Sequence, residues 1–538
     1  MAFKNSFYNL KKHVTSGSAR AINPESDPKM TDWEKVDYYC RNRKCGAGER
    51  VLPASMCEDI DLNEFFLFAD RTESIVGEQY LYSRLLTDKE SIDFEEQESW
   101  VGRMERDKSL SGLLQKLLSR LKRREAYYLP HLFLDLSFTK PFYHGWMQLL
   151  SLLPLLLLVV SFWEPACLFL LFGVLLINLM IHLHNKRIMF MYQDSIPPLY
   201  SLICAAEGLL NLEGPAGYEK ERTAVKKLSG DKYKMQLFTL ESKSDDSLLS
   251  LLYLVFDYLK VFFLIEPLWA YRLLDKLKKH QEEVETLFTF VGRIDSYLSV
   301  YRLRKQLSFY TLPAWGDEVK AELSFTDLYH PLIGDCVPNS LDTEGKSVLL
   351  TGSNMAGKTS FIRAIALNVL SAKTLNTAFA KSIRLSPFAL YSSIRITDSL
   401  NEGVSYYQKE VQTIGEMIEA STKSGTKLFL LDELYKGTNT QERIAAGKAV
   451  LNFLADPEEN MVFVSTHDME LAALLEKNYE LYHFTETVSG DAIHFDYKLK
   501  RGVLTTRNAI RILQLNAYPE SIIQEALSLL ENSKKNHI

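Results

Sequence analysis

Residues 347–370 read SVLLTGSNMAGKTSFIRAIALNVL, and this stretch decides the fold of the C-terminal part of the chain. A short apolar run leads into the loop Gly352–Thr359, and apolar residues at helical spacing follow the loop. The loop has the pattern G-x-x-x-x-G-K-S/T between a strand and a helix, which is the arrangement that a phosphate-binding P-loop requires. The sequence therefore predicts an α/β domain with a parallel sheet and a nucleotide site at this loop.

The residues of this loop have distinct expected tasks. Glycine lets successive backbone N–H groups wrap phosphates, and the following helix directs its positive end at them. Lys358 is expected to reach the β- and γ-phosphates, and the Thr359 hydroxyl to bind Mg²⁺. The predicted cofactors are therefore ATP and Mg²⁺. The predicted nucleotide-binding residues of the loop are Gly352, Ser353, Asn354, Met355, Ala356, Gly357, Lys358, Thr359 and Ser360.

Two further apolar strands end in polar residues. KLFLLDELYKGTNT places Asp432 and Glu433 after the first, and MVFVSTHDMEL places His467 after the second. The carboxyl ends of parallel strands converge on ligand, so these side chains are expected beside the phosphates. We predict that Asp432 holds the Mg²⁺ shell, that Glu433 orients or deprotonates the attacking water, and that His467 senses the γ-phosphate. The predicted catalytic residues are Glu433, His467 and Lys358.

These segments resemble the MutS family. GSNMAGKTS is similar to the family's TGPNMGGKST, DELYKGTNT to DELGRGTST, and STHDMEL to ATHxxEL. LYHPLI, VPNSL, ITDSLNEGVSYYQKEV and the stretch beginning YKLKRG resemble further blocks in the same order. Upstream, residues 69–86 (ADRTESIVGEQYLYSRLL) resemble the opening of the family's helical core. The resemblance implies a DNA mismatch repair type of ATPase with a helical core and lever domain ahead of it.

The resemblance also implies a dimer. In the family two ATPase domains pair, and each ATP is also contacted by the partner's G-x-S segment, which carries over to Gly403 and Ser405. Tyr497 matches a position that packs near the adenine. A homodimer with composite ATP sites is therefore expected.

Several positions depart from the family pattern. Ala356 replaces the second loop glycine, Tyr435 and Lys436 replace Gly-Arg, and Asn439 replaces Ser. Nucleotide binding should survive the first change, because the second glycine, Lys358 and Thr359 are retained. The other three are expected to affect coupling between subunits. The residues before Asp70 are too few for the family's mismatch-reading and connector domains, so neither domain is expected ahead of the helical core.

A charge-free stretch interrupts the helical part. WMQLLSLLPLLLLVVSF ends at Phe162, and ACLFLLFGVLLINLMIHL follows Trp163-Glu164-Pro165. Each run is about long enough for a hydrocarbon core of about 30 Å. The flanking Lys140, Lys186 and Arg187 indicate cytosolic ends. We predict a two-span hairpin over 145–183 in the cytoplasmic membrane, with both termini and the ATPase domain in the cytosol; the alternative is a buried hairpin of a soluble protein.

Composition sets the remaining limits. The formal net charge is -6, so any contact with DNA needs a local basic patch such as Lys122–Arg124 or Lys276–His280. The six cysteines lack the paired C-x-x-C spacing of a zinc site.

The predicted domains are an irregular lead-in over 1–60, helical core over 61–140, the hairpin over 145–183, helical core and lever over 186–315, and the ATPase domain with a C-terminal helical segment over 321–538.

Two functions remain open at this level. The first is a membrane-anchored MutS-like ATPase coupled to binding of mismatched or structured duplex DNA. The second is a membrane-bound ATP-driven switch or scaffold that acts on a protein partner without DNA. A transporter ATPase of the ABC type is disfavoured, because its LSGGQ signature is absent and two short spans cannot form a substrate pathway.

Overall fold

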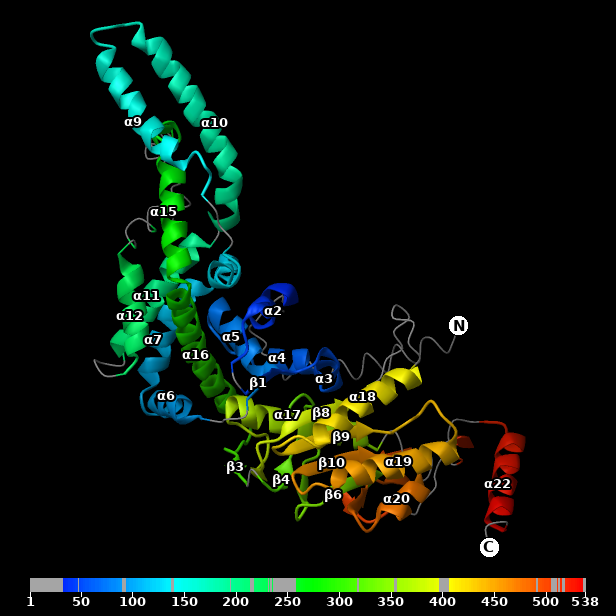
Figure 1. Cartoon of the computed structure of the whole chain (residues 1–538). Coiled ribbons are helices and arrows are strands. Elements are labelled where there is room, and N and C mark those ends of the chain that lie inside the picture. Colours follow the sequence, from blue (N-terminus) through cyan, green and yellow to red (C-terminus); the bar gives the residue numbers. More distant parts are fainter. Residues whose placement is uncertain are drawn as a thin grey trace.

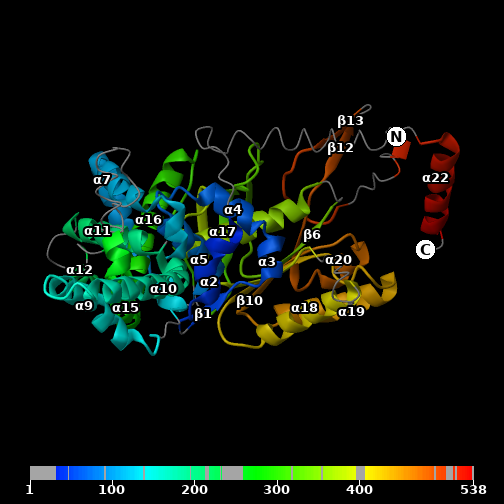
Figure 2. The ribbon, with the colours of Figure 1, turned by 90° about the horizontal axis from the view of Figure 1, so that it is seen from above.

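A helical region and an α/β domain make up the part of the chain that the computed structural model describes (Figure 1). The described residues are 32–535 except 47, 90–92, 137–139, 194, 213–216, 231, 233–234, 236–257, 317–318, 353–355, 396–405, 490–491, 505–509, 511–512 and 515–517. Figure 2 shows the same two regions side by side when the molecule is seen from above. The predicted order, helices first and a mostly parallel sheet second, is confirmed.

The main sheet of the α/β domain has six strands in the order β14-β11-β6-β10-β9-β8. All neighbours pair in parallel except β11 and β14, which are antiparallel. Every residue of the central strands β6 and β10 is buried, as expected for parallel strands covered on both faces. The strands are β6 (Ser347–Thr351), β8 (Ala389–Ser393), β9 (Lys427–Asp432), β10 (Asn460–Ser465), β11 (Tyr479–His483) and β14 (Lys500–Arg501).

A second sheet has the order β3-β7-β4-β5, and a two-stranded ribbon joins β12 and β13. Their strands are β3 (Ala314–Trp315), β4 (Leu323–Leu328), β5 (Asn339–Asp342), β7 (Ser382–Leu385), β12 (Glu486–Ser489) and β13 (Ala492–Phe495). Because β3 pairs with β7, this sheet begins before residue 321. The helices of the domain are α17 (Lys358–Leu375), α18 (Tyr406–Ser421), α19 (Thr440–Ala455), α20 (Met469–Leu475) and α22 (Glu520–Lys535).

The helical region is built around one long helix, α16 (Gln281–Gln306), which packs against α5, α6, α11 and α12. Its other elements are α2 (Trp33–Asn42), α3 (Ala54–Asp59), α4 (Leu62–Ala69), α5 (Ile75–Leu86), α6 (Glu95–Arg106), α7 (Lys108–Leu118), η1 (Ser119–Leu121), η2 (Arg124–Tyr128), α8 (His131–Leu134), α9 (His144–Val160), α10 (Cys167–Gln193), α11 (Ile196–Leu212), α12 (Glu219–Ser229), α15 (Ile265–Lys279), and the short strands β1 (Glu49–Val51) and β2 (Thr87–Lys89).

The predicted irregular lead-in over 1–60 differs from the structure in its second half. Helices α2 and α3 and strand β1 lie there, and Val36, Met56 and Ile60 are fully buried. Pro53 does not prevent helix formation there, because it stands at the N-cap of α3. Proline is tolerated at a helix start because the first N–H groups have no partner within the helix.

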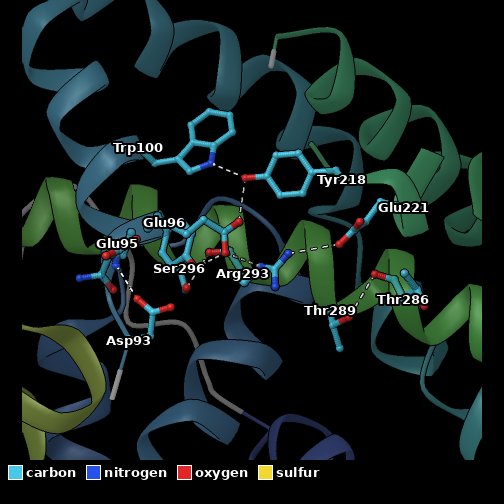
Figure 3. A network of polar contacts seen from close by, with 12 residues as sticks. Asp93, Glu95, Glu96, Trp100, Tyr218, Glu221, Thr286, Thr289, Arg293 and Ser296 are labelled. Atoms are coloured by element: carbon cyan, nitrogen blue, oxygen red, sulfur yellow. Dashed lines mark hydrogen bonds and ion pairs between the residues drawn. The ribbon is translucent and has the colours of Figure 1, made fainter. Parts of the chain in front are cut away.

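A polar network holds α16 against its neighbours (Figure 3). The Glu96 carboxylate of α6 accepts from the Tyr218 hydroxyl at 2.8 Å, and that hydroxyl accepts from the Trp100 indole at 3.1 Å. Arg293 of α16 pairs with Glu96 at 3.3 Å and with Glu221 of α12 at 3.3 Å. Each charged group in this cluster has an opposite partner, so burial carries no unpaired charge. The network therefore fixes the side-by-side position of α6, α12 and α16.

A second contact ties α16 to the start of α5. The Asp295 carboxylate is fully buried and accepts from the backbone N–H groups of Glu73 and Ser74, at 2.9 and 2.8 Å. A side chain at Gly77 would meet it, since a Cβ there would lie 2.2 Å from its Oδ2. Burial is the main influence on this carboxyl, and it raises the pKa of Asp295 to about 6.

This shift predicts a pH-dependent stability. The folded-state pKa of Asp295 lies above the ordinary 3.8, so the group stabilises the fold below about pH 4 and loses that contribution as pH rises through 6. A shift of about two pKa units corresponds to stability on the order of 3 kcal/mol. We expect the Tm of the wild type to fall relative to that of Asp295→Asn between pH 4 and 7. A constant difference between the two proteins would contradict this assignment.

Helices α9 and α10 form an antiparallel pair that projects away from the rest of the molecule (Figure 1, cyan). Among the described helices, only α10 is long and apolar enough to cross a membrane, over Cys167–Asn185, with a mean hydropathy of 2.2. Helix α9 has 17 residues and ends at Val160, because the chain turns before Pro165. The structure thus has one helix of spanning length where the sequence predicts two.

Candidate ATPase site

Three neighbouring strands bring the predicted site residues together. The P-loop follows β6, the Asp432–Glu433 pair ends β9, and His467 follows β10, which lies between the other two strands. Parallel pairing sets the register, with Ser465 opposite both Leu350 and Asp432. All three strands point their carboxyl ends to the same edge of the sheet.

Two glycines shape the loop. Gly352 has a φ of +138°, and a Cβ there would lie 2.6 Å from the backbone oxygen of Phe484. Gly357 has a φ of +102°, and a Cβ there would lie 3.3 Å from the Tyr497 ring. Ala356, where the family pattern has glycine, does not adopt a positive φ, and its methyl group is buried in the core. The alanine is therefore compatible with the loop.

Lys358 and Thr359 open helix α17. The Lys358 ammonium donates to the Gly352 carbonyl at 2.5 Å and lies 3.4 Å from Nε2 of His467. Burial lowers the pKa of Lys358 to about 8, against the attraction of Asp432 and Glu433. The Thr359 hydroxyl donates to Oδ2 of Asp432 at 2.8 Å. These two oxygens are of the kind that Mg²⁺ prefers, and they lie at the phosphate end of the loop, so the donor set fits this ion.

Glu433 faces His467. Its Oε1 lies 2.6 Å from Nε2 of His467, and its Oε2 lies 3.4 Å from the Lys436 ammonium. The hydrogen bond with His467 lowers the pKa of Glu433 to about 2; burial opposes this shift and Lys436 adds to it. The carboxylate is therefore ionised at neutral pH. An ionised carboxylate beside the phosphate site can orient water and accept its proton.

The loop after Glu433 contains backbone strain. Glu433 and Tyr435 have φ values of +60° and +57°, in the region that favours glycine. Such residues cost on the order of 1–3 kcal/mol each unless their surroundings hold them. The Tyr435 N–H donates to the buried Glu410 carboxylate of α18, and its ring packs into the core beneath the sheet. Tyr435 therefore holds a left-handed backbone conformation, which a glycine would adopt without strain.

The other departures have local explanations. Asn439 is the N-cap of α19, and its side chain accepts from the Glu442 N–H at 2.9 Å. Asparagine and serine are comparably good N-caps, so this change preserves the helix start. Lys436 contacts Glu433, so Lys436 lies at the candidate site itself. The sequence had suggested only an effect on coupling between subunits.

An aromatic ring lies beside the loop. Tyr497 contacts Gly357 and stacks on Phe495, with ring centroids 5.9 Å apart. Asn339 holds its backbone: Nδ2 donates to the Tyr497 carbonyl at 3.0 Å, and Oδ1 accepts from the Leu499 N–H at 2.8 Å. The ring is 45% exposed and so is accessible to a planar ligand next to the P-loop.

Some of the predicted site residues lie outside the described part of the chain. The structure also shows site residues that the sequence did not predict. Ser353, Asn354, Met355, Gly403 and Ser405 belong to the first group. Ser360 is described and is exposed on α17. The residues that sequence reasoning did not assign to the site are Asn339, Glu410, Lys436, Ser465 and Glu486. Ser465 donates to Asp432, and its place two residues before His467 could have indicated it.

The phosphate loop after a central strand, the carboxylate pair on a nearby strand and the histidine at the end of the strand between them define a P-loop ATPase. Residues 348–534 match the family model MutS domain V. This part of the chain is therefore a MutS-type ATPase domain.

Curated relatives agree with this placement. The DNA mismatch repair protein MutS of Persephonella marina is 29% identical over 249 residues, which cover 45% of this chain and 28% of the relative. Endonuclease MutS2 of Thermus thermophilus is 30% identical over 259 residues, covering 48% and 34%. The DNA mismatch repair protein MSH3 of Candida glabrata is 28% identical over 269 residues, covering 47% and 26%. The chain thus spans about a third or less of these relatives' length.

Proposed function

We propose that the protein is a membrane-anchored MutS-type ATPase whose nucleotide cycle acts on a helical arm. The observation that carries this proposal is the continuous connection from the P-loop to the apolar hairpin. Helix α17 begins at Lys358 and ends at Leu375, where it meets α6 and α16; α15 lies at the other end of α16, and α10 packs against α15 (Figure 1).

The site residues have the following proposed roles. Lys358 binds the β- and γ-phosphates, and Thr359 and Asp432 hold Mg²⁺, which neutralises phosphate charge when bound. Glu433 orients and deprotonates water, and His467 positions Glu433 and senses the γ-phosphate. Tyr497 stacks on the adenine. Ser405 completes the site of a second copy, so the active form is a homodimer with composite ATP sites.

The hairpin supports the membrane part of this proposal. A core helix of a soluble protein is mostly buried, whereas only 11% of the apolar stretch of α10 is buried. Large apolar side chains are exposed on both helices, which is an unusually large apolar surface for a soluble protein. The exposed ones on the helices include Trp146, Leu149, Leu152, Leu155, Leu156, Phe169, Leu170, Phe172 and Met180, and Phe162 and Trp163 are exposed in the turn between them. This surface supports an anchor in a membrane, and we propose the cytoplasmic membrane with the ATPase domain facing the cytosol.

Deleting residues 145–183 tests the anchor. The rings of Tyr143 and His184 lie 6.3 Å apart, so a short Gly-Ser linker can close the gap. We expect the full chain to stay with membranes after alkaline carbonate washing, and the deleted chain to become soluble while it retains ATPase activity. The Lys358→Ala variant is the control and should remain in the membrane. Carbonate extraction of the full chain would contradict the anchor.

Coupling to DNA is the finer part of the proposal. It is supported by the relatives, two of which are named as DNA mismatch repair proteins and one as an endonuclease. In the structure Lys122–Arg124 is an exposed basic stretch beside η2. Such a stretch would meet the phosphate backbone without reading bases.

A protein partner without DNA is the second candidate. It is favoured by the ion pairing of basic side chains in the helical region. Lys122 lies 3.5 Å from Glu73, Arg302 lies 3.3 Å from the same carboxylate, and Lys227 lies 2.5 Å from Glu283. Paired cations contribute less to a basic surface than free ones.

Salt dependence separates the two candidates. We expect the detergent-solubilised protein to bind duplex DNA at 50 mM salt and to lose affinity steeply, on the order of 10³-fold, by 200 mM. Fluorescence anisotropy of labelled duplexes, with and without mismatches, measures this. Absence of binding at low salt, with ATPase activity intact, would reject the DNA proposal in favour of a protein partner.

A further inference from the structure

We infer that the lipid-facing unit of the protein is larger than the hairpin: residues 258–265 enter the near interface of the same bilayer, and Asn178 ties them to α9 and α10. This inference rests on the proposed membrane anchor. It adds a third segment to the unit and assigns a positioning role to one polar residue within it.

Asn178 lies in the middle of the apolar stretch of α10, and its side chain is fully buried. Its Nδ2 donates two hydrogen bonds. One goes to the Leu150 carbonyl of α9 at 3.0 Å, and the other to the Phe262 carbonyl at 2.6 Å. A single amide group therefore contacts both α9 and the segment of residues 258–262.

The first acceptor is a carbonyl that its own helix cannot satisfy. In an α-helix the Leu150 carbonyl would accept from the N–H of residue 154. That residue is Pro154, which lies inside α9 and has no N–H. Asn178 supplies the missing donor.

The second acceptor lies where a helical turn ends. Residues 258–262 are helical, and Leu264 then takes a left-handed φ of +50° before α15 begins at Ile265. Carbonyls in the last turn of a helix lack partners from a following turn, so the Phe262 carbonyl needs a donor from elsewhere. The second N–H of Asn178 supplies it.

This arrangement matters most in a lipid environment. Water is absent there, so a carbonyl without a donor costs several kcal/mol. An asparagine amide has two donors, and here both meet carbonyls that the helices leave open. An apolar side chain at 178 would fit the composition of α10 equally well but would leave both carbonyls unsatisfied.

The surface of residues 258–265 is suited to lipid. Tyr258, Leu259 and Ile265 are 55%, 43% and 48% exposed. The segment contacts the hairpin at the level of Leu150, which lies one helical turn, about 6 Å, beyond Trp146. Trp146 marks the expected interface, where tyrosine is also favoured.

The charged residue of this segment, Lys260, fits a position of the segment at the membrane interface. Lys260 is partly buried and is attracted by the Glu266 carboxylate. A lysine stem can lie along apolar surface while its ammonium reaches the polar layer. The segment therefore dips into the near leaflet and does not cross the membrane.

A photo-reactive benzoylphenylalanine placed at single positions of the full chain tests the surface. In vesicles of phosphatidylcholine and phosphatidylglycerol, we expect lipid adducts by mass spectrometry at position 259, at 156 on the hairpin, and not at 113. Leu113 on α7 is 48% exposed, which matches Leu259 in exposure but lies in the helical region. Adducts at 156 without adducts at 259 would overturn this inference and leave the anchor standing, whereas no adduct at 156 would overturn both.

A double-mutant cycle tests the role of Asn178. We expect Asn178→Leu to lower the Tm of the vesicle-bound protein by about 5 °C. Adding Pro154→Ala should recover about half of that shift, because residue 154 then donates to the Leu150 carbonyl itself. Purely additive effects of the two substitutions would overturn the assigned hydrogen bond. A merely space-filling role for Asn178 predicts no such recovery.

Discussion

Replacing Glu433 by alanine is expected to leave ATP binding intact and to reduce kcat by about 100-fold or more, the range typical of a general base. The carboxylate is ionised, lies 2.6 Å from Nε2 of His467, and stands at the carboxyl end of β9 beside the P-loop. Its loss removes the group that accepts the proton of water but leaves the phosphate contacts of Lys358. Phosphate release under saturating ATP measures turnover, and binding of a fluorescent ATP analogue measures affinity.

Two further variants make this result specific. Lys436→Ala removes a neighbour of the same carboxylate and should change kcat by no more than about threefold, because an exposed ion pair contributes little. Lys358→Ala should instead abolish nucleotide binding itself. Normal turnover in Glu433→Ala would refute its assignment as the base.

Replacing Arg304 by methionine is expected to lower the Tm on the order of 10 °C. The Arg304 guanidinium is buried and pairs with both oxygens of Glu98 at 2.8 Å, and it also donates to the Asn376 carbonyl at 2.8 Å. The loss of Arg304 costs on the order of 3 kcal/mol, because the partly exposed Glu98 carboxylate loses its bidentate partner and the Asn376 carbonyl loses this donor. A loss of about 3 kcal/mol in the free energy of unfolding lowers the Tm on the order of 10 °C in a domain of about 150–250 residues.

Arg302 provides the matched control. It lies two residues away on α16, is partly exposed, and pairs with Glu73 at 3.3 Å. Arg302→Met should cost less than Arg304→Met, because Glu73 keeps Lys122 as a second cationic partner at 3.5 Å. Glu98→Gln combined with Arg304→Met should be less harmful than the sum of the single changes, because no charge is then left alone. Equal Tm values for the two methionine variants would contradict a special role of Arg304.

The parts of the fold that were predictable are those set by local order along the chain. The P-loop, the Asp432–Glu433 pair and His467 each directly follow an apolar strand, and parallel pairing then gathers them at one edge of the sheet. The end of α9 at Val160 was not predictable from composition. The apolar run continues to Phe162, whereas the helix stops where the chain prepares to turn.

Contacts between residues that are far apart in the sequence were not predictable. Glu98 meets Arg304, Ser74 meets Asp295, and Asn339 meets Tyr497 across more than 150 residues of chain. No periodicity or spacing marks such pairs. The sequence did show that Tyr435 stands at a glycine position, but only the structure shows that Glu410 holds its backbone in the glycine-like shape.

The contact between α17 and α16 would act as a pivot, because a small tilt of α16 there moves its far end by a larger distance. Helix α16 begins at Gln281, so it extends about 35 Å from the Arg304 contact toward α15. A tilt of about 5° at that contact would shift its far end by about 3 Å, as the length of a helix of this size dictates. The hairpin projects still farther from the pivot, so it would sweep a wider arc. A tilt that leaves the hydrogen bonds at the nucleotide domain intact would thus move the hairpin by several ångströms, which is about the length of a contact with a lipid headgroup.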